Sequence, residues 1–217
     1  MNKSMTRSMV LAINLLVFSA YVNAAPSGET IARQGNGKGA VACISCHGDK
    51  GQGNEAAGYP YLAGQPLAYL VKQLHDFANK RRPNPIMQPF ASALSEDEIK
   101  AVASYYAQLP LPKITSAKKS PSQTTTGEFL AKEGKWSVGM PACFQCHGDQ
   151  GRGIAPNFPA ISGQPASYIK KQLEHWRKGE RTNDPIGLMQ AVVADLDESE
   201  ITAVADYLSE QSPTTYK

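Results

Sequence analysis

Two short motifs contain the residues of this sequence that could do chemistry. Cys-Ile-Ser-Cys-His occupies residues 43–47, and Cys-Phe-Gln-Cys-His occupies residues 143–147. Cysteines at positions i and i+3 lie about one helical turn apart, so each thiol can add to one vinyl group of the same haem while the next histidine binds the iron. We therefore predict two covalently bound haem c groups, attached at Cys43, Cys46, Cys143 and Cys146, with His47 and His147 as iron ligands.

Three other uses of these cysteines fit the motifs less well. A structural zinc site needs a tetrahedron of ligands, and adjacent cysteine and histidine side chains would crowd one ion. A thioredoxin-like redox pair belongs in a βαβ setting, for which the sequence gives no strand pattern. Disulfide bonds in an exported protein would account for the cysteines. They would not account for a histidine directly after each second cysteine.

Methionines are the candidates for the second iron ligand. Met87 is the only methionine within residues 25–112, and the second half contains Met140 and Met189. Met140 lies just before Cys143, on the attachment side of the haem, whereas Met87 and Met189 each precede a leucine by seven residues. Core packing is the alternative role for methionine, but both follow prolines in segments expected to be irregular. We predict that Met87 and Met189 bind the irons.

His75 and His175 are the rival ligands. They are one hundred residues apart, but the repeat around them runs at an offset of 99 and pairs His75 with Glu174. They therefore occupy different helix positions, and we expect both at the surface. Two His/Met-ligated irons would be six-coordinate, with raised reduction potentials and no open position for catalysis. We expect an electron carrier and not an enzyme.

The sequence is an internal duplication. The pattern Ala-Cys-x-x-Cys-His-Gly-Asp-x-Gly-x-Gly at residues 42–53 returns at 142–153, and the Gly-Gln-Pro at 64–66 returns at 163–165. Helical periodicity without strand-like alternation predicts an all-α fold of two tandem domains. We assign residues 25–112 to the N-terminal domain, 113–127 to a polar linker and 128–217 to the C-terminal domain.

Residues typical of helix starts predict where two pairs of equivalent helices begin. Ser95 and Glu98 have the spacing of a capping box, and Asp197 and Glu200 repeat it in the second half. A second pair is expected to begin near residues 66 and 165, because a proline suits the first turn of a helix.

Residues 1–24 have the features of an export signal. Lys3 and Arg7 form a basic start, residues 9–22 are apolar, and Val-Asn-Ala precedes the expected cleavage site. The apolar stretch is shorter than the roughly 20 residues that span a bilayer. We therefore expect a cleaved signal peptide and a periplasmic protein, with at most peripheral contact with membrane complexes. The mature chain carries +1, and four haem propionates would bring it to about −3, which argues against a nucleic-acid partner.

With these features the sequence resembles the cytochrome c4 family of two-domain, dihaem class I cytochromes. The resemblance rests on the paired Cys-His-Gly sites, on Pro-x-Leu-x-Gly-Gln at 60–65 with Pro-x-Ile-x-Gly-Gln at 159–164, and on the two methionine-to-leucine spacings. It implies two cytochrome c domains with their haems near the interface, taking electrons from the bc1 complex or a similar respiratory donor and passing them to a terminal oxidase. It also implies that the Pro60 and Pro159 carbonyls orient the two histidine ligands.

Two other functions stay open at this point. One is the dihaem cytochrome subunit of a flavocytochrome sulfide dehydrogenase-type oxidoreductase, which has a similar architecture. The other is an enzyme such as a dihaem peroxidase or a thiosulfate dehydrogenase, which would need an open or unusual coordination position. Charge is uneven along the chain, with +1 on residues 25–112, +3 on 113–127 and −3 on 128–217. We expect the two ends of the molecule to face different partners.

Overall fold

The computed structural model describes residues 26–112 and 121–212. The expected signal peptide and part of the expected linker lie outside these ranges. The described residues form helices joined by loops, with isolated bridges such as Asn54 to Tyr59 but no β-strand. None of the described helices combines the length and the apolarity needed to cross a bilayer. The prediction of an all-α fold is confirmed.

Helix α5 (Glu96–Gln108) is the centre of the first half. The predicted capping box is present: Ser95 Oγ accepts from the Glu98 N–H, and the Glu98 carboxylate accepts from the Ser95 N–H. Helices α1 (Gly28–Gln34) and α3 (Leu67–Ala78) pack on α5, and the short α4 (Met87–Ser92) packs on α3. The buried apolar residues between these helices are Ile31, Ala32, Leu70, Val102, Ala103 and Tyr106.

The second half repeats this arrangement around α10 (Glu198–Glu210). Asp197 and Glu200 form the predicted capping box at its start. Helices α6 (Pro121–Lys132) and α8 (Ala166–Arg177) pack on α10, and α9 (Leu188–Val193) packs on α8. Leu130, Ile169, Val193, Ile201, Val204 and Leu208 contribute to its core. Both α3 and α8 begin directly after a proline, Pro66 and Pro165, as the sequence predicted.

A glycine on each N-terminal helix lets it cross the long helix closely. A Cβ atom at Gly28 of α1 would lie 2.0 Å from the Ala101 carbonyl oxygen of α5. A Cβ atom at Gly127 of α6 would lie 2.2 Å from the Ala203 oxygen of α10. Helix α6 begins at Pro121, so residues 121–127, expected as linker, are helical. The polar run has no apolar period of its own, and the contact of α6 with α10 gives this segment a packing partner.

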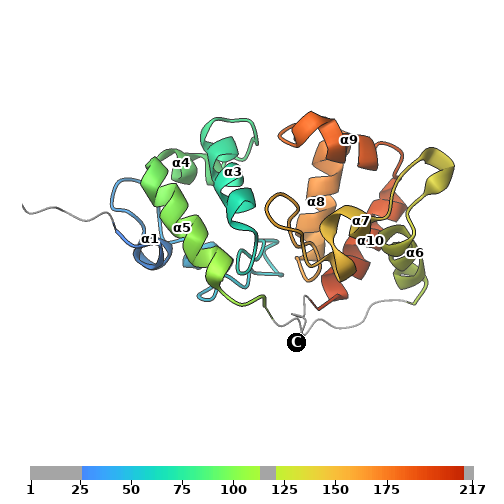
Figure 1. Cartoon of the computed structure of the whole chain (residues 1–217), viewed down its shortest axis with the longest axis horizontal. Coiled ribbons are helices and arrows are strands. Elements are labelled where there is room, and N and C mark those ends of the chain that lie inside the picture. Colours follow the sequence, from blue (N-terminus) through green and yellow to red (C-terminus); the bar gives the residue numbers. More distant parts are fainter. Residues whose placement is uncertain (1–25, 113–120, 213–217) are drawn as a thin grey trace, which may run out of the picture.

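The two halves lie side by side, with α3 and α8 facing each other across the middle of the molecule (Figure 1). Loops and short helical turns complete each half: α2 (Ile44–His47), η1 (Trp136–Val138), α7 (Cys143–His147), η2 (Asp149–Gly151) and η3 (Pro185–Gly187). The short helices α2 and α7 contain the cysteine–histidine motifs. Each half therefore has its own core and its own motif, and the interface lies between equivalent helices.

Candidate functional site

The cysteine–histidine motifs form single helical turns. Cys43 caps α2 and His47 ends it, while α7 begins at Cys143 and ends at His147. All four cysteines of the two motifs are free thiols. Cys43 and Cys143 pack against the apolar cores of their own halves. Burial raises the pKa of the Cys43 thiol and raises that of Cys143 to about 11. An uncharged thioether to haem suits these surroundings.

Each motif histidine is oriented by a proline carbonyl. The distance from His47 Nδ1 to the Pro60 oxygen is 2.8 Å, and that from His147 Nδ1 to the Pro159 oxygen is also 2.8 Å. A carbonyl only accepts, so Nδ1 carries the hydrogen and the Nε2 lone pair is left for a metal. Burial lowers the pKa of both imidazoles, which favours the neutral form that binds iron. The implied role of the two prolines in orienting these histidines is confirmed.

Met87 and Met189 occupy equivalent places in the two halves. Met87 is the first residue of α4, and Met189 is the second residue of α9. Both are half-buried, and Met189 packs against the C-terminal core. The methionines lie on short helices, whereas the sequence suggested irregular segments. The irregular part ends at Ile86 in the first half and at η3 in the second.

The rival histidines are engaged elsewhere. His75 Nε2 lies 3.2 Å from the Glu96 carboxylate, and His175 Nε2 lies 3.5 Å from the Glu180 carboxylate. Both imidazoles are partly exposed. As the sequence suggested, the two histidines have different surroundings.

Polar residues that the sequence patterns did not single out as an interface join the two halves. Gln65 and Gln164, and likewise Arg82 and Arg181, are buried and hydrogen-bond across the interface. Both pairs are 99 residues apart, which is the offset of the repeat in this region. That offset was a signal in the sequence, because a polar residue kept in both copies points to a shared structural role.

Comparison with known proteins places these features in a family. The family model described as cytochrome c oxidase, cbb3-type, subunit III matches residues 27–105, and the model described as cytochrome c matches residues 131–212. A cytochrome c4 from Thiocapsa roseopersicina is 42% identical over 80% of this chain and 89% of its own length. The chain belongs to the cytochrome c4 family. As a member it is a dihaem electron carrier, with two covalently bound haem c groups in two tandem cytochrome c domains.

Two further relatives of this cytochrome concern thiosulfate oxidation. The thiosulfate dehydrogenase electron acceptor of Thiomonas intermedia (strain K12) is 44% identical over 81% of this chain and 82% of its own length. The solved thiosulfate dehydrogenase TsdBA of Marichromatium purpuratum is 39% identical, with a TM-score of 0.79 over 85% of this chain. The present cytochrome spans 39% of the length of that TsdBA chain.

Proposed function

We propose that this cytochrome accepts electrons from a thiosulfate-oxidising dehydrogenase and passes them to a respiratory acceptor such as a terminal oxidase. The observation that carries the proposal is the similarity, over most of the chain, to a thiosulfate dehydrogenase electron acceptor. The match to part of a TsdBA chain supports it. Residues 1–24 would serve as a cleaved export signal, which would place the exchange in the periplasm.

Each iron in this proposal has a histidine and a methionine ligand. His47 pairs with Met87, and His147 pairs with Met189. The free Nε2 of each histidine and the matching positions of the methionines support this assignment. The hydrogen bond that each histidine donates from its ring N–H to a backbone carbonyl makes the imidazole a stronger iron ligand. Haem c supplies the one-electron couple, and His/Met ligation gives it a high reduction potential.

The electron count fits the proposed donor. Joining two thiosulfate ions into one tetrathionate ion forms one S–S bond and releases two electrons. Two haems accept one electron each, so one molecule of the cytochrome takes up both electrons that one such oxidation releases. The chain then needs no substrate site of its own. This separates the carrier role from that of the dehydrogenase.

Mixing experiments with two donors test the proposal. The oxidised holoprotein is mixed with a thiosulfate dehydrogenase plus thiosulfate, and haem reduction is followed optically in a stopped-flow instrument. We expect rapid reduction that saturates with dehydrogenase concentration and vanishes without thiosulfate. A parallel reaction uses bc1 complex and quinol as the donor. Faster reduction by the bc1 complex than by the dehydrogenase would overturn the proposed donor.

A further inference from the structure

A short segment of the C-terminal domain exposes three large apolar side chains. Phe129 of α6 is 58% exposed, and Trp136 and Val138 of η1 are 64% and 44% exposed. Single exposed apolar residues are common on protein surfaces, but a group of them marks a contact surface for another molecule. We call Phe129, Trp136 and Val138 the apolar patch.

Backbone hydrogen bonds hold the segment that carries the apolar patch. The Phe129 carbonyl accepts from the Gly134 N–H at 3.1 Å, so α6 ends against the start of the loop that contains η1. Two bonds close this loop: Lys135 N donates to the Met140 carbonyl at 2.8 Å, and Met140 N donates to the Lys135 carbonyl at 3.1 Å. The patch residues of η1 lie in the turn between them. A surface that is already ordered loses less conformational entropy when a partner binds.

The N-terminal domain forms the same loop without the apolar patch. Asn36 N donates to the Ala40 carbonyl at 3.1 Å and closes the equivalent loop. The residues between Asn36 and Ala40 are Gly-Lys-Gly, and Thr30, 99 residues before Phe129, stands at the equivalent position of α1. The fold therefore does not need aromatic side chains here, because one copy of the repeat is built without them. A role outside the fold explains why the other copy exposes them.

The apolar patch lies far from the domain interface and close to a haem-attachment cysteine. Figure 1 shows α6 and the loop that follows it at the end of the C-terminal domain away from α3. Cys143 Sγ lies 3.8 Å from the carbonyl oxygen of Leu130, the neighbour of Phe129. Met140, which ends the loop, belongs to the core cluster on which Cys143 packs. Electron-transfer rates fall steeply with distance, so this surface suits a partner that exchanges electrons with the C-terminal haem.

Carboxylates border the apolar patch. Lys135 Nζ lies 2.9 Å from the Glu200 carboxylate and 3.1 Å from the Asp195 carbonyl oxygen. The pKa of Lys135 is raised by Glu200 first, and also by the nearby charges of Asp197 and Asp195. Glu133, at the other side of the loop start, is exposed, as are Asp195 and Asp197. The loop that carries the patch therefore begins among negative charges.

The neighbouring cations do not reverse the sign of this border. Lys132 is paired with the Glu128 carboxylate, and Arg177 donates to the Leu196 carbonyl at 2.8 Å. With them the border has three cations, Lys132, Lys135 and Arg177, and five carboxylates, Glu128, Glu133, Asp195, Asp197 and Glu200. Its net charge is 3 − 5 = −2. An apolar centre with an acidic border complements a partner surface that has an apolar centre and a basic border.

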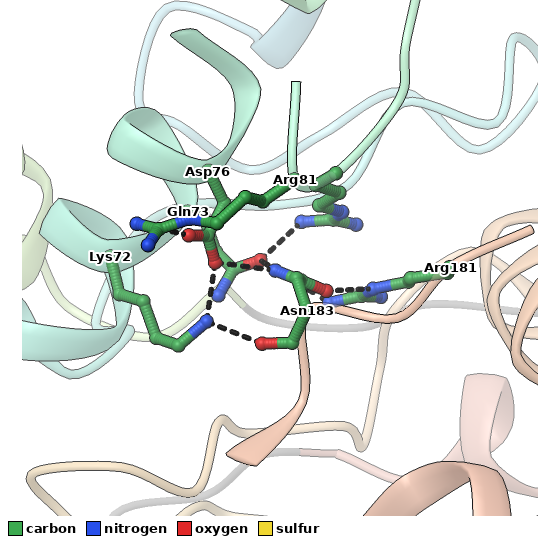
Figure 2. Close-up of polar contacts among 7 residues, drawn as sticks. Lys72, Gln73, Asp76, Arg81, Arg181 and Asn183 are labelled. Carbon is green, nitrogen blue, oxygen red and sulfur yellow. Dashed lines mark hydrogen bonds and ion pairs between the residues drawn. The ribbon is translucent and has the colours of Figure 1, made fainter. Parts of the chain in front are cut away.

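A second copy of this chain matches the border poorly. Lys72 and Arg81 of the N-terminal domain both contact the buried carboxylate of Asp76 (Figure 2). Lys100 is paired with Glu96. These cations are held by carboxylates of their own domain, and residues 128–217 carry −3. A different protein with a basic surface is the better partner.

We propose that the apolar patch is the docking surface of the C-terminal domain for a redox partner protein whose contact face has an apolar centre and a basic border. Trp136 is the central contact, because tryptophan is among the residues that contribute most binding energy at interfaces. When the ferrous C-terminal haem gives one electron to the partner's redox cofactor, the haem becomes ferric and that cofactor is reduced. The reverse transfer uses the same contact. The inference rests on the electron-carrier role and not on the identity of the electron donor.

Oxidation of the reduced holoprotein by two small complexes tests the surface without a protein partner. Tris(phenanthroline)cobalt(III) is an apolar cation, like the proposed partner face, and ferricyanide is an anion. Each takes one electron from a ferrous haem, which gives cobalt(II) or ferrocyanide. Stopped-flow spectroscopy measures both second-order rate constants. The variants are Trp136→Gly and Phe129→Thr, which introduce the residues of the N-terminal domain, with Leu67→Ser on an exposed leucine of α3 as the control.

We expect Trp136→Gly and Phe129→Thr each to slow the cobalt reaction several-fold and to leave the ferricyanide reaction unchanged, which also shows that the haems are intact. Leu67→Ser should leave both rates unchanged. A cobalt rate that did not change in either patch variant, or that fell equally in Leu67→Ser, would overturn the proposal. Equal slowing of the cobalt and ferricyanide reactions would also overturn it, because the loss would then not be specific to an apolar cation.

Binding to protein partners gives a readout other than electron transfer. Isothermal titration calorimetry measures the affinity of the oxidised holoprotein for a thiosulfate dehydrogenase and for a solubilised terminal oxidase. We expect Trp136→Gly to weaken binding to at least one of them about fivefold or more. Glu133→Gln and Asp195→Asn should reduce the salt dependence of the same interaction. Unchanged affinity for both partners would overturn the docking surface, whereas failure of the wild type to bind the dehydrogenase would count only against the proposed donor.

Sedimentation velocity tests the second copy as the occupant of the patch. We expect the wild-type holoprotein to stay monomeric at the concentrations used for calorimetry. A dimer that forms in the wild type and is lost in Trp136→Gly would assign the apolar patch to self-association and overturn the proposal.

Discussion

Gln65 and Gln164 make the same pair of hydrogen bonds to the opposite domain. Gln65 Nε2 donates to the Ala160 carbonyl at 2.8 Å, and Gln65 Oε1 accepts from the Ala160 N–H at 3.0 Å. Gln164 makes both bonds with Tyr61, each at 3.0 Å. Each glutamine side chain thus satisfies the backbone N–H and C=O of one residue in the opposite domain. Tyr61 and Ala160 directly follow Pro60 and Pro159, whose carbonyls orient the haem histidines, so the interface and the haem sites share one segment.

Loss of either glutamine should weaken the interface. Gln65→Ala or Gln164→Ala leaves a buried backbone N–H and a buried carbonyl without partners, and each such group costs about 1–3 kcal/mol. We expect each variant to lower the free energy of unfolding of the holoprotein by about 2 kcal/mol or more, measured by urea titration. The control is Gln52→Ala, because Gln52 is exposed and its amide bonds to its near neighbours Lys50 and Asp49. Equal losses in all three variants would contradict this role.

Replacement of each proposed methionine ligand should affect one haem only. Met87→Ala should remove the near-infrared methionine-to-iron charge-transfer band of the N-terminal haem, and Met189→Ala that of the C-terminal haem. Each altered haem should have a lower potential or bind small ligands such as carbon monoxide. Met140→Ala is the matched control, since Met140 is a buried core residue close to Cys143. If only Met140→Ala removed a band, the assignment of Met189 would be wrong.

The helix starts and the repeated helices could be predicted from the sequence, because interactions between residues close in the chain determine them. The capping boxes at Ser95 and Asp197 depend on residues three positions apart. The repeat gave the matching helices and the matching methionines. The His47–Pro60 hydrogen bond followed from family resemblance and not from any rule of spacing.

The interface between the two domains could not be predicted from the sequence, because it depends on how the two halves of the repeat pack against each other. Arg82 and Arg181 are 99 residues apart, which is the offset of the repeat, but the sequence does not say that α3 and α8 meet. The helical segment before Gly127 was missed for a similar reason. Its polar residues have no amphipathic period, and the close crossing of α6 with Ala203 is a tertiary contact.

Gly53 should be intolerant of a side chain. Its φ is +81°, and a Cβ atom would lie 2.7 Å from Tyr61 N and 2.9 Å from the Pro60 carbonyl carbon. Its N–H also donates to the His47 carbonyl at 2.8 Å. We expect Gly53→Ala to displace the segment that orients His47 and to lower the stability by about 2–4 kcal/mol, since overpacking adds to backbone strain.

The control for Gly53 is a glycine that also has a positive φ but has room for a side chain. Gly37 has a φ of +68°, and apart from its chain neighbours no described atom lies within 4 Å of a Cβ placed there. Gly37→Ala should cost only about 1 kcal/mol. Urea unfolding and the pyridine haemochrome assay measure stability and haem content of both variants. Comparable losses in the two variants would show that strain, and not displacement of the Pro60 segment, is responsible.

Glu98 should make the stability of the N-terminal domain depend on pH. Only 2% of its surface is exposed, and its carboxylate accepts from the Ser95 N–H at 2.8 Å and from Asn36 Nδ2 at 3.2 Å. The hydrogen bond from the Ser95 N–H is the main cause that lowers the pKa of Glu98 below its ordinary value of 4.5. The Asn36 hydrogen bond and the positive charge of Lys38 lower it further. The charged carboxylate therefore stabilises the fold at pH values above 4.5, and this contribution is lost as pH falls through the lowered pKa.

Glu98→Gln tests this pH dependence directly, because it keeps the size of the side chain and removes its charge. At pH 7 we expect the variant to be less stable than the wild type by about 1–2 kcal/mol, since hydrogen bonds to a charged group are stronger than neutral ones. The difference should shrink as the pH is lowered below 4.5, where wild-type Glu98 also becomes protonated. Urea unfolding at a series of pH values measures it, with Glu133→Gln on the exposed surface as the charge-matched control. A deficit that stayed constant across this range would mean that Glu98 stabilises the helix through packing and not through its charge.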